Sequence, residues 1–270
     1  MGSMSRALRE FVAQHERLFV LTGAGCSTES GIPDYRDADG NWKRTPPVTL
    51  QAFMGSAATR QRYWARSMEG WRFFGRAKPN RTHHALARLE AAGRTELLLT
   101  QNVDRLHQAA GSERVIDLHG RLDVVRCTGC GAETRREVMQ DWLRSLNPHW
   151  AVSAAPVAPD GDADLDGVDF SAFAIPACSC CDGVLKPDVV FFGENVPRSR
   201  VDTAFAALDR ADAVLVVGSS LTVYSGFRFV DAAARAGKEI AAVNLGRTRA
   251  DHLLSLKVAE PCAEALAFLL

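Results

Sequence analysis

The amino-acid sequence predicts an α/β protein in which a parallel β-sheet is joined to a small metal-binding and helical module. Residues 213–217, Ala-Val-Leu-Val-Val, form a continuous aliphatic run, which is typical of a central parallel strand covered on both faces. An earlier apolar run, Leu18–Leu21, leads into Gly23-Ala24-Gly25, as strands do where dinucleotide sites begin. Two C-x-x-C pairs, at 127–130 and 178–181, indicate the metal-binding module.

Composition sets outer limits on the function. The chain has 270 residues, 47% of them hydrophobic, with 32 basic and 32 acidic side chains. It could hold one large domain, alone or with a smaller one, and its zero net charge favours neither a nucleic-acid nor a membrane partner. No apolar run approaches the roughly 20 residues of a spanning helix, and no secretory signal is present, so we expect a cytoplasmic protein. Met1-Gly2-Ser3 is typical of residues left by cloning before a native Met4, so we expect the fold to begin at Met4.

The stretch Leu21–Asp37, LTGAGCSTESGIPDYRD, is the central feature of the sequence. Glycine lets the backbone approach a pyrophosphate, and N–H groups of the turn bind the anion. A G-x-G alone is weak, since ordinary α/β domains also contain glycine-rich turns, and Thr28 stands where the usual fingerprint has a third small residue. The polar continuation through Ser30 to Arg36, which contains Gly31 and Pro33, predicts a loop over a bound nucleotide.

Apolar periodicity and glycine stops predict the remaining elements. Helices are expected at residues 4–17, 50–74, 80–92, 200–210, 227–236 and 261–270. Strands are expected at residues 18–21, 96–100, 115–118, 213–217 and 239–243, and the segment 185–194 is expected to be a strand that leads into a turn. The adjacent His83 and His84 point in different directions on a helix, so they predict a capping or surface role and no metal pair.

Glycine, amide and hydroxyl groups follow the predicted strands at their carboxyl ends. These segments are Gln101-Asn102-Val103-Asp104, His119-Gly120, Gly218-Ser219-Ser220 and Asn244-Leu245-Gly246. Ligands of open α/β sheets bind at the carboxyl ends of strands. The strand ends at Gly23, Gln101, His119, Gly218 and Asn244 therefore predict one site along one sheet edge, where backbone N–H groups and hydroxyls bind a diphosphate.

The four paired cysteines predict a structural zinc ion. Cys127, Cys130, Cys178 and Cys181 would supply four thiolates to a tetrahedral site, which leaves no open position for a catalytic water. Cys180 offers an alternative partner for Cys178, although the spacing and the following Gly183 favour Cys181. The competing interpretation is a set of free buried cysteines.

A Pro-, Ala- and Asp-rich insertion, Asn147–Pro176, separates the two pairs. Its Asp162-x-Asp164-x-Asp166-Gly167 resembles the start of a calcium loop, but Phe173 occupies the twelfth position, where a bidentate glutamate is needed. We interpret the insertion as a solvated loop.

Most of the chain, from Leu18 to Cys262, resembles the sirtuin family of NAD-dependent protein-lysine deacylases. The resemblance rests on the glycine loop, TQNVD at 100–104, LHG at 118–120, the four cysteines, KPDVVFFGE at 186–194, GSS at 218–220 and NLG at 244–246, in this order. Tyr63-Trp64-Ala65-Arg66, the long insertion and Val223-Tyr224-Ser225-Gly226 are similar to the class II branch that contains a weakly deacetylating mitochondrial sirtuin.

The resemblance implies a Rossmann-like NAD-binding domain made of residues 4–37, 93–120 and 184–270. It also implies a helical module at 38–92 and a zinc-binding module with the acidic insertion at 121–183. An acylated-lysine protein or peptide would enter a cleft between the large domain and a smaller module that combines the zinc ribbon with the helical stretch near 50–74. The reaction would release nicotinamide and O-acyl-ADP-ribose.

The resemblance also implies roles for individual residues. His119 would act as general base on the ribose hydroxyl, Asn102 would position ribose and water, and Asp104 would shape the nicotinamide-ribose pocket. The Val190–Gly193 strand, with Val190, Phe192 and Gly193 as substrate residues, would pair with the peptide. The other cofactor-binding residues would be Gly23, Ala24, Gly25, Pro33, Asp34, Tyr35, Arg36, Gln101, Gly218, Ser219, Ser220, Asn244, Leu245, Gly246 and Cys262.

Two alternatives concern the substrate and the reaction. Tyr63-x-x-Arg66 lies on one helix face and resembles the pair with which acid-acyl sirtuins recognise a carboxylate, although Arg66 could equally be a surface residue beside a core tyrosine. Mono-ADP-ribosyl transfer to protein would use the same NAD site. A catalytically silent NAD sensor is disfavoured, because it has no need of a general base such as His119.

Overall fold

A computed structural model describes residues 3–34, 47–150 and 168–270, and the side chains from residue 6 onward. The described chain forms two compact units. The first holds residues 3–34, 78–118 and 196–270, and the second holds residues 47–77, 119–150 and 168–195. None of the described helices is long and apolar enough to cross a bilayer.

The first unit is built on a six-stranded sheet in the order β3-β2-β1-β7-β8-β9. Its strands are β1 (Leu18–Thr22), β2 (Thr95–Thr100), β3 (Val115–Asp117), β7 (Ala213–Val217), β8 (Glu239–Val243) and β9 (Leu256–Val258), and every pairing is parallel. The chain adds β2 and β3 on one side of β1, and β7, β8 and β9 on the other. The strand order therefore reverses between β1 and β7, the place where open α/β sheets bind ligands.

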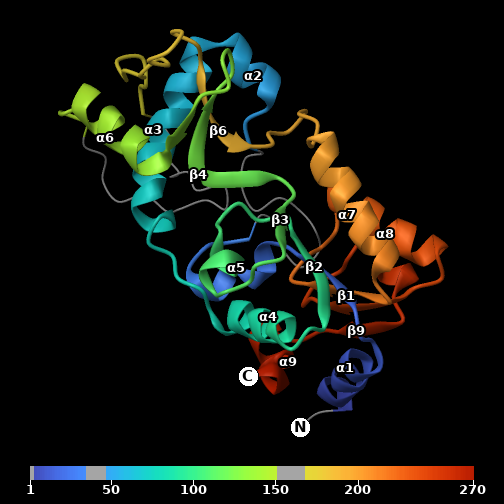
Figure 1. Cartoon of the computed structure of the whole chain (residues 1–270). Helices are drawn as coiled ribbons and strands as arrows, with labels where there is room; N and C mark the ends of the chain where they lie inside the picture. Colours follow the sequence, from blue (N-terminus) through green and yellow to red (C-terminus); the bar gives the residue numbers. More distant parts are fainter. Residues whose placement is uncertain (1–2, 35–46, 151–167) are drawn as a thin grey trace. The chain divides into compact units, whose positions relative to one another are not determined.

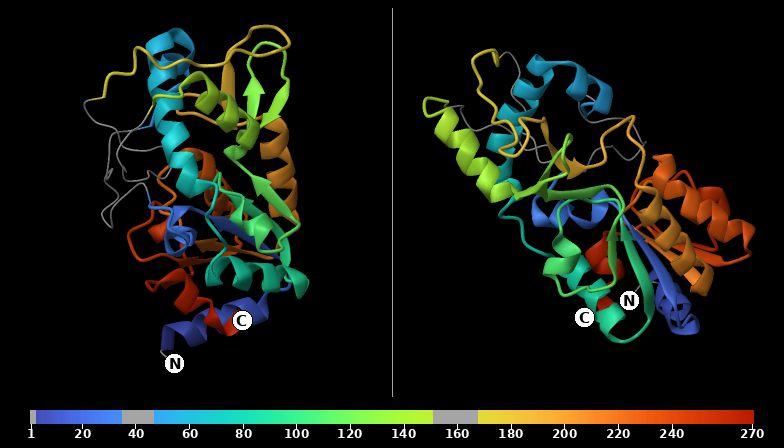
Figure 2. Two further views of the ribbon diagram at one scale, coloured as in Figure 1. Left: turned by 90° about the vertical axis from the view of Figure 1, so that its left-hand side faces the viewer. Right: turned by 45° about the horizontal axis from the view of Figure 1, so that its top comes forward.

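Helices cover both faces of this sheet (Figures 1 and 2). On one face, α7 (Arg198–Arg210) and α8 (Tyr224–Arg235) pack on alternate strand residues such as Phe19 and Leu21. On the other, α1 (Ser3–Gln14), α4 (Arg81–Ala91) and α9 (Cys262–Ala265) pack on Leu18 and Val20. All five residues of β1 and of β7 are consequently buried, which explains their aliphatic runs.

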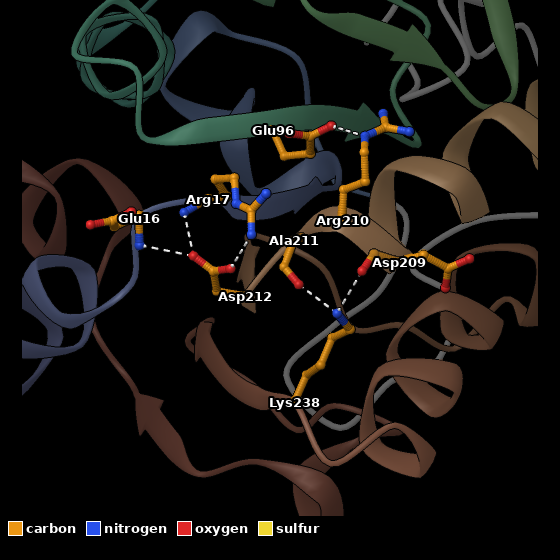
Figure 3. Close-up of polar contacts among 8 residues, drawn as sticks. All are labelled: Glu16, Arg17, Glu96, Asp209, Arg210, Ala211, Asp212 and Lys238. Carbon is orange, nitrogen blue, oxygen red and sulfur yellow. Dashed lines mark hydrogen bonds and ion pairs between the residues drawn. The ribbon is translucent and has the colours of Figure 1, made fainter.

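Polar contacts join the segments at the amino-terminal edge of the sheet (Figure 3). Just before β7, the Asp212 carboxylate accepts hydrogen bonds from the backbone N–H groups of Glu16 (3.1 Å) and Arg17 (2.9 Å). Lys238, which precedes β8, donates to the carbonyls of Asp209 (3.1 Å) and Ala211 (2.5 Å) at the end of α7. These bonds fix the strand starts at the edge opposite the predicted site.

The second unit combines helices with a small antiparallel sheet in the order β5-β4-β6. Its elements are α2 (Leu50–Gly55), α3 (Ala57–Phe74), β4 (Gly120–Cys127), β5 (Glu133–Arg135), α6 (Arg136–Leu146) and β6 (Leu185–Val189). Its core contains a group of aromatic residues: Phe53 meets Tyr63 and Phe191 edge to face, with ring centroids 5.4 and 5.2 Å apart. Trp64 on α3 donates its indole N–H to the Leu185 carbonyl of β6 at 3.2 Å.

Arg136 is fully buried in the same core. Its guanidinium lies over the rings of Trp64 and Trp71 and donates to the Gln140 side chain at 2.7 Å and to the Ser67 carbonyl at 3.1 Å. A buried cation held in this way ties α6 to α3.

The units differ from the domain boundaries expected from sequence in three places. Residues 78–92 belong to the first unit, because the apolar side of α4 covers the parallel sheet. Residues 184–195 belong to the second, because β6 pairs antiparallel with β4 and does not return to the large sheet. The second unit also begins at His119, two residues earlier than the expected 121.

Most expected helices and strands are present, with changes at their ends. The helix expected at 50–74 is split at Ser56, whose extended backbone ends α2 and whose hydroxyl caps α3. The helix expected at 261–270 is a single α-helical turn followed by a 3-10 turn, Ala267–Leu269. The first helix ends at Gln14, so residues 15–17 form a link to β1.

Candidate cofactor site and zinc centre

Four strands of the large sheet end in the predicted segments. β1 runs into Gly23, β2 into Gln101, β7 into Gly218 and β8 into Asn244. Because these strands are parallel neighbours, the four segments share one edge, as expected. The fifth strand, β3, is followed by Leu118, which donates its N–H to the Thr100 carbonyl at 2.8 Å, and then by His119, where the second unit begins.

Glycines meet where the strand order reverses. The Gly25 N–H donates to the Gly218 carbonyl at 2.8 Å, and a Cβ on Gly218 would lie 2.4 Å from the Cys26 nitrogen. Gly218 also has a φ of +61°, which L side chains rarely adopt. Residues Ala24–Cys26 and Thr28–Ser30 form 3-10 turns. Residues 31–34, the described part of the predicted loop, then follow without helix or strand, as the sequence predicts. The close contact between Gly25 and Gly218 fixes the glycine loop against the end of β7, with no side-chain bulk at either residue.

Gln101 is held across the same point. Its side-chain oxygen accepts a hydrogen bond from the Ser219 hydroxyl at 2.7 Å. A Cβ on Gly226 would lie 2.6 Å from the Gln101 amide nitrogen, so glycine at this position of α8 leaves room for the Gln101 side chain as it is placed here. The ends of β2 and β7 are thereby bound together beside the glycine loop.

Asn102 and Asp104 converge on Ser27, a residue that the sequence analysis did not single out. The Asn102 amide donates to the Gly23 carbonyl at 3.0 Å and to the Ser27 hydroxyl at 3.1 Å, and Ser27 donates to Asp104 at 2.6 Å. The other Asp104 oxygen accepts from the Leu106 N–H at 2.9 Å. Burial raises the pKa of Asp104, opposed by these hydrogen bonds. The two predicted side chains are thus fixed against the glycine loop.

Two buried histidines extend this network. His83 Nδ1 accepts from the Asn80 N–H at 3.2 Å in a capping box, so Nε2 carries the proton and lies 3.5 Å from the Ser27 hydroxyl. His107 Nε2 lies 2.9 Å from the Thr22 hydroxyl, and the two imidazole centroids are 4.8 Å apart. Burial lowers the pKa of His83 to about 4 and that of His107 well below its usual range. The expected capping role of His83 is confirmed, but the residue is buried and not on the surface.

The predicted adenosine side lies at the ends of β8 and β9. The Asn244 amide donates to the Gly246 carbonyl at 3.0 Å, and Leu245 is exposed. A hydrogen bond from Cys26 lowers the pKa of Cys262, and burial raises the pKa of Cys26. Ser220 is only partly buried, and its hydroxyl lies 3.0 Å from that of Thr222.

The remaining predicted cofactor residues belong to the glycine loop and its continuation. Ala24 opens the first 3-10 turn, and Pro33 and Asp34 are partly buried. Tyr35 and Arg36 lie outside the described residues, as does the segment 162–167, which resembles the start of a calcium loop. Phe173, its twelfth position, is buried in the aromatic core of the second unit.

The four predicted metal ligands cluster in the second unit. The sulfurs of Cys127, Cys130, Cys178 and Cys181 all lie within 4.8 Å of one another. A hydrogen bond from the Cys130 N–H lowers the pKa of Cys127 to about 6, whereas the neighbouring thiols raise the pKa of Cys181 to about 12. Four thiolates so close together therefore require a cation to compensate their charge, which zinc supplies. The exposed Cys180 is outside the cluster, so the choice of Cys181 is confirmed. Four thiolates at these distances fit a structural zinc ion.

The predicted substrate segment follows β6 in the same unit. The Val190 N–H donates to the His119 carbonyl at 2.8 Å, and the Phe192 carbonyl accepts from the Leu50 N–H at 2.9 Å. Gly193 has a φ of +77° and accepts from the Gln51 side chain at 3.3 Å. An added peptide strand would have to pair beside these bonds. Gly120 is equally constrained, since a Cβ there would lie 2.0 Å from the Asp188 carbonyl oxygen.

The predicted acyl-recognition pair lies on α3. Tyr63 is buried in the aromatic core, against Phe53, Trp64 and Phe191, and Arg66 is partly buried one turn later. Their spacing on one helix agrees with the sequence prediction, and their role stays a prediction.

Comparison with known proteins identifies the family. The chain is 72% identical over 263 residues to an "NAD-dependent protein deacetylase" of Xanthomonas campestris pv. campestris (strain 8004), covering 97% of this chain and 90% of that protein. It is 47% identical over 264 residues to the bovine (Bos taurus) "NAD-dependent protein lipoamidase sirtuin-4, mitochondrial", covering 97% and 84%.

Solved structures and a family model agree with these relatives. A structure of Sir2 with p53 peptide and NAD+ superposes with a TM-score of 0.80 at 31% identity, covering 98% of this chain and 96% of that one. The model of the Sir2 family matches residues 23–225. This match spans both units, from the glycine loop through the four cysteines to Ser225, and the chain therefore belongs to the Sir2 family, the sirtuins.

Proposed function

We propose that this protein is an NAD-dependent protein-lysine deacylase that releases nicotinamide and O-acyl-ADP-ribose. The observation that carries the proposal is the arrangement at the carboxyl edge of the six-stranded sheet, where β1 and β7 end side by side. There a glycine loop, the Gln101–Ser219 bond and the Asn102–Ser27–Asp104 network come together. The deacetylase name of the Xanthomonas relative supports the same reaction.

The residues of the first unit would bind and orient NAD. The Gly23 and Gly25 N–H groups donate to the Val217 and Gly218 carbonyls, so the turn would receive the diphosphate at Ala24 and along its bare glycine backbone, with Ser219 and Ser220 beside it. Asn244 to Gly246 and Cys262 would hold the adenosine half. Asn102 would orient the nicotinamide ribose and a water molecule. Asp104, held by Ser27 and the Leu106 N–H, would keep that pocket in shape. Pro33, Asp34, Tyr35 and Arg36 would enclose the nicotinamide side.

His119 would be the general base. When bound, NAD would supply an electrophilic anomeric carbon for the acyl oxygen of the modified lysine, with nicotinamide as the leaving group. His119 would then take the proton from a ribose hydroxyl, a task that suits a side chain able to change protonation near neutral pH. The backbone bond between His119 and Val190 supports a fixed place for the histidine beside the proposed peptide strand.

The preferred acyl group would be selected by α3. We extend the proposal to Tyr63 and Arg66 as a pair that recognises an acidic acyl chain, since an arginine fork binds a carboxylate through two hydrogen bonds. Arg66→Met should then reduce activity on succinyl- or glutaryl-lysine far more than on acetyl-lysine. Equal losses on both would contradict this extension. The lipoamidase name of the bovine relative makes a lipoyl-lysine peptide a necessary member of the panel.

A mass-spectrometric assay tests the reaction. The protein is incubated with NAD and lysine peptides that carry acetyl, longer aliphatic, lipoyl or acidic acyl groups, with His119→Tyr as control. NAD-dependent acyl loss that disappears in the variant is the expected result. ADP-ribose added to protein, without acyl loss from any peptide, would instead indicate mono-ADP-ribosyl transfer. None of the relatives described above is named for that reaction. The cytoplasmic location and the lack of nucleic-acid or membrane partners stay predictions.

A further inference from the structure

A largely buried ammonium group contacts the Val190–Gly193 segment, with which the substrate peptide would pair. Lys186 is on β6, and its side chain is only 12% exposed. Its Nζ donates to the Val189 carbonyl at 2.5 Å and to Glu194 Oε2 at 3.0 Å, and it lies 4.6 Å from the centre of the Phe191 ring. A charge this far from water is retained only where several partners compensate it, and these three do.

Glu194 links this ammonium to the backbone of the strand. The same Oε2 that receives Lys186 also accepts the Phe191 N–H at 2.8 Å, and the Glu194 N–H donates back to the Phe191 carbonyl at 3.0 Å. Gly193, with its φ of +77°, makes the turn between them. Both backbone polar groups of Phe191 are therefore bonded to Glu194, whose orientation depends on Lys186.

The ends of the same segment are fixed independently. The Val190 N–H is bonded to the His119 carbonyl, and the Phe192 carbonyl to the Leu50 N–H. Phe191, which lies between these two attachment points, is therefore held by Glu194 and, through it, by Lys186. Loss of the ammonium would leave a partly buried carboxylate without its cation and would release the middle of the segment while its ends stay attached.

We propose that Lys186 is a positioning residue for peptide recognition: through Glu194 it holds the Val190–Gly193 segment in the shape that an acyl-lysine peptide pairs with. The inference rests on the proposed deacylase function for its kinetic readout. It predicts a specific pattern, in which peptide affinity depends on Lys186 and NAD affinity does not, because the NAD-binding residues belong to the first unit.

Three variants and a matched control test the inference. Lys186→Met removes the charge and keeps the length, Lys186→Arg keeps the charge, and Glu194→Gln removes the partner's charge at constant size. Lys238→Met is the control, because Lys238 likewise donates to backbone carbonyls, but at the amino-terminal edge of the large sheet (Figure 3). Zinc content and Tm establish that each variant is folded, and Glu194→Gln replaces Lys186→Met if the latter does not fold.

The expected result is a KM for peptide raised about tenfold in Lys186→Met, the worth of one charged hydrogen bond, with the KM for NAD within about twofold. Lys186→Arg should restore most of the peptide affinity, and Lys238→Met should leave it unchanged. Backbone hydrogen exchange across residues 186–195 should accelerate in Lys186→Met and should not change in Lys238→Met. An unchanged peptide KM, or equal losses for peptide and NAD, would overturn the inference.

A direct binding measurement separates this inference from the proposed function. Fluorescence anisotropy with a labelled acyl-lysine peptide reports affinity without turnover. If the wild-type protein removes no acyl group, the proposed function fails, while weaker peptide binding by Lys186→Met still supports the positioning role. If exchange accelerates but peptide affinity is unchanged, Lys186 has only a structural role and the inference is wrong.

Discussion

The buried histidine of the cofactor-site network predicts a loss of stability in mild acid. Burial, together with the charge of His84, lowers the pKa of His83 from 6.5 to about 4 in the folded protein. The unfolded chain therefore binds a proton below pH 6.5 that the folded chain does not bind until about pH 4. Stability must fall as the pH decreases through this window. Between pH 7 and pH 5 the loss from His83 alone is about 2 kcal/mol.

Neighbouring groups modify this slope in known directions. His107, whose ring lies 4.8 Å from that of His83, has a lowered pKa and adds to the loss. Asp104, joined to the network through Ser27, has a raised pKa, so the folded state takes up its proton first and the loss is partly offset at the acid end. The interval from pH 7 to pH 5 isolates the histidines best.

Urea unfolding at pH 7, 6 and 5 measures the effect in wild type and in His83→Gln. Glutamine can still cap the helix, as in S/T-x-x-E/Q boxes, but cannot titrate. The decrease in unfolding free energy between pH 7 and pH 5 should be smaller by about 2 kcal/mol in the variant. Zinc release in acid affects both proteins alike and cancels in the difference. His252→Gln, at an exposed histidine, controls for the substitution. Parallel profiles of wild type and His83→Gln would refute the reasoning.

Three further outcomes follow from the geometry. Gly218→Ala should lower the free energy of unfolding by about 2 kcal/mol or more and abolish the stabilisation by NAD, because there is no room for its Cβ. Gly237→Ala is the control, since Gly237 also has a positive φ but open space around it, and should lower the free energy of unfolding by only about 1 kcal/mol. Urea and thermal unfolding with and without NAD measure both effects. Cys178→Ser should lose the zinc ion and Cys180→Ser should keep one ion per chain, as metal analysis would show. Ser27→Ala should lower kcat about tenfold or more, because Asn102 and Asp104 lose their common partner, whereas a kcat within twofold of wild type would argue against the network.

The sequence predicts the large sheet well because its strands are buried on both faces. A run such as 213–217, short, rich in valine and followed by glycine, is typical of a strand covered on both faces, and the polar or glycine segment after it marks the carboxyl end. The strand at 185–189 is predicted equally well as a strand, but not its partner. Its sequence, Leu-Lys-Pro-Asp-Val, leads into an apolar stretch and indicates an extended segment, but it does not say whether that segment joins a parallel or an antiparallel sheet.

The residues that the sequence did not reveal are those whose partners are distant in the chain. Ser27 contacts Asp104, 77 residues away, and Thr22 contacts His107, 85 residues away. Neither serine nor threonine carries a spacing signal. His83 shows one detectable sign, a polar side chain three residues after the cap residue Asn80. Capping alone, however, does not predict that its other nitrogen faces the glycine loop.

His119 shows how local sequence and long-range pairing combine at one residue. Its predecessor, Leu118, is bonded to Thr100 of the parallel sheet, and its own carbonyl is bonded to Val190 at the end of β6. At Gly120 the backbone lies so close to the Asp188 carbonyl oxygen that a Cβ would clash with it. Glycine is therefore a steric requirement at position 120, whereas the bonds of Leu118 and His119 are made by backbone atoms that any residue supplies. A substitution at Gly120 should consequently impair the placement of His119 even though it leaves the imidazole intact.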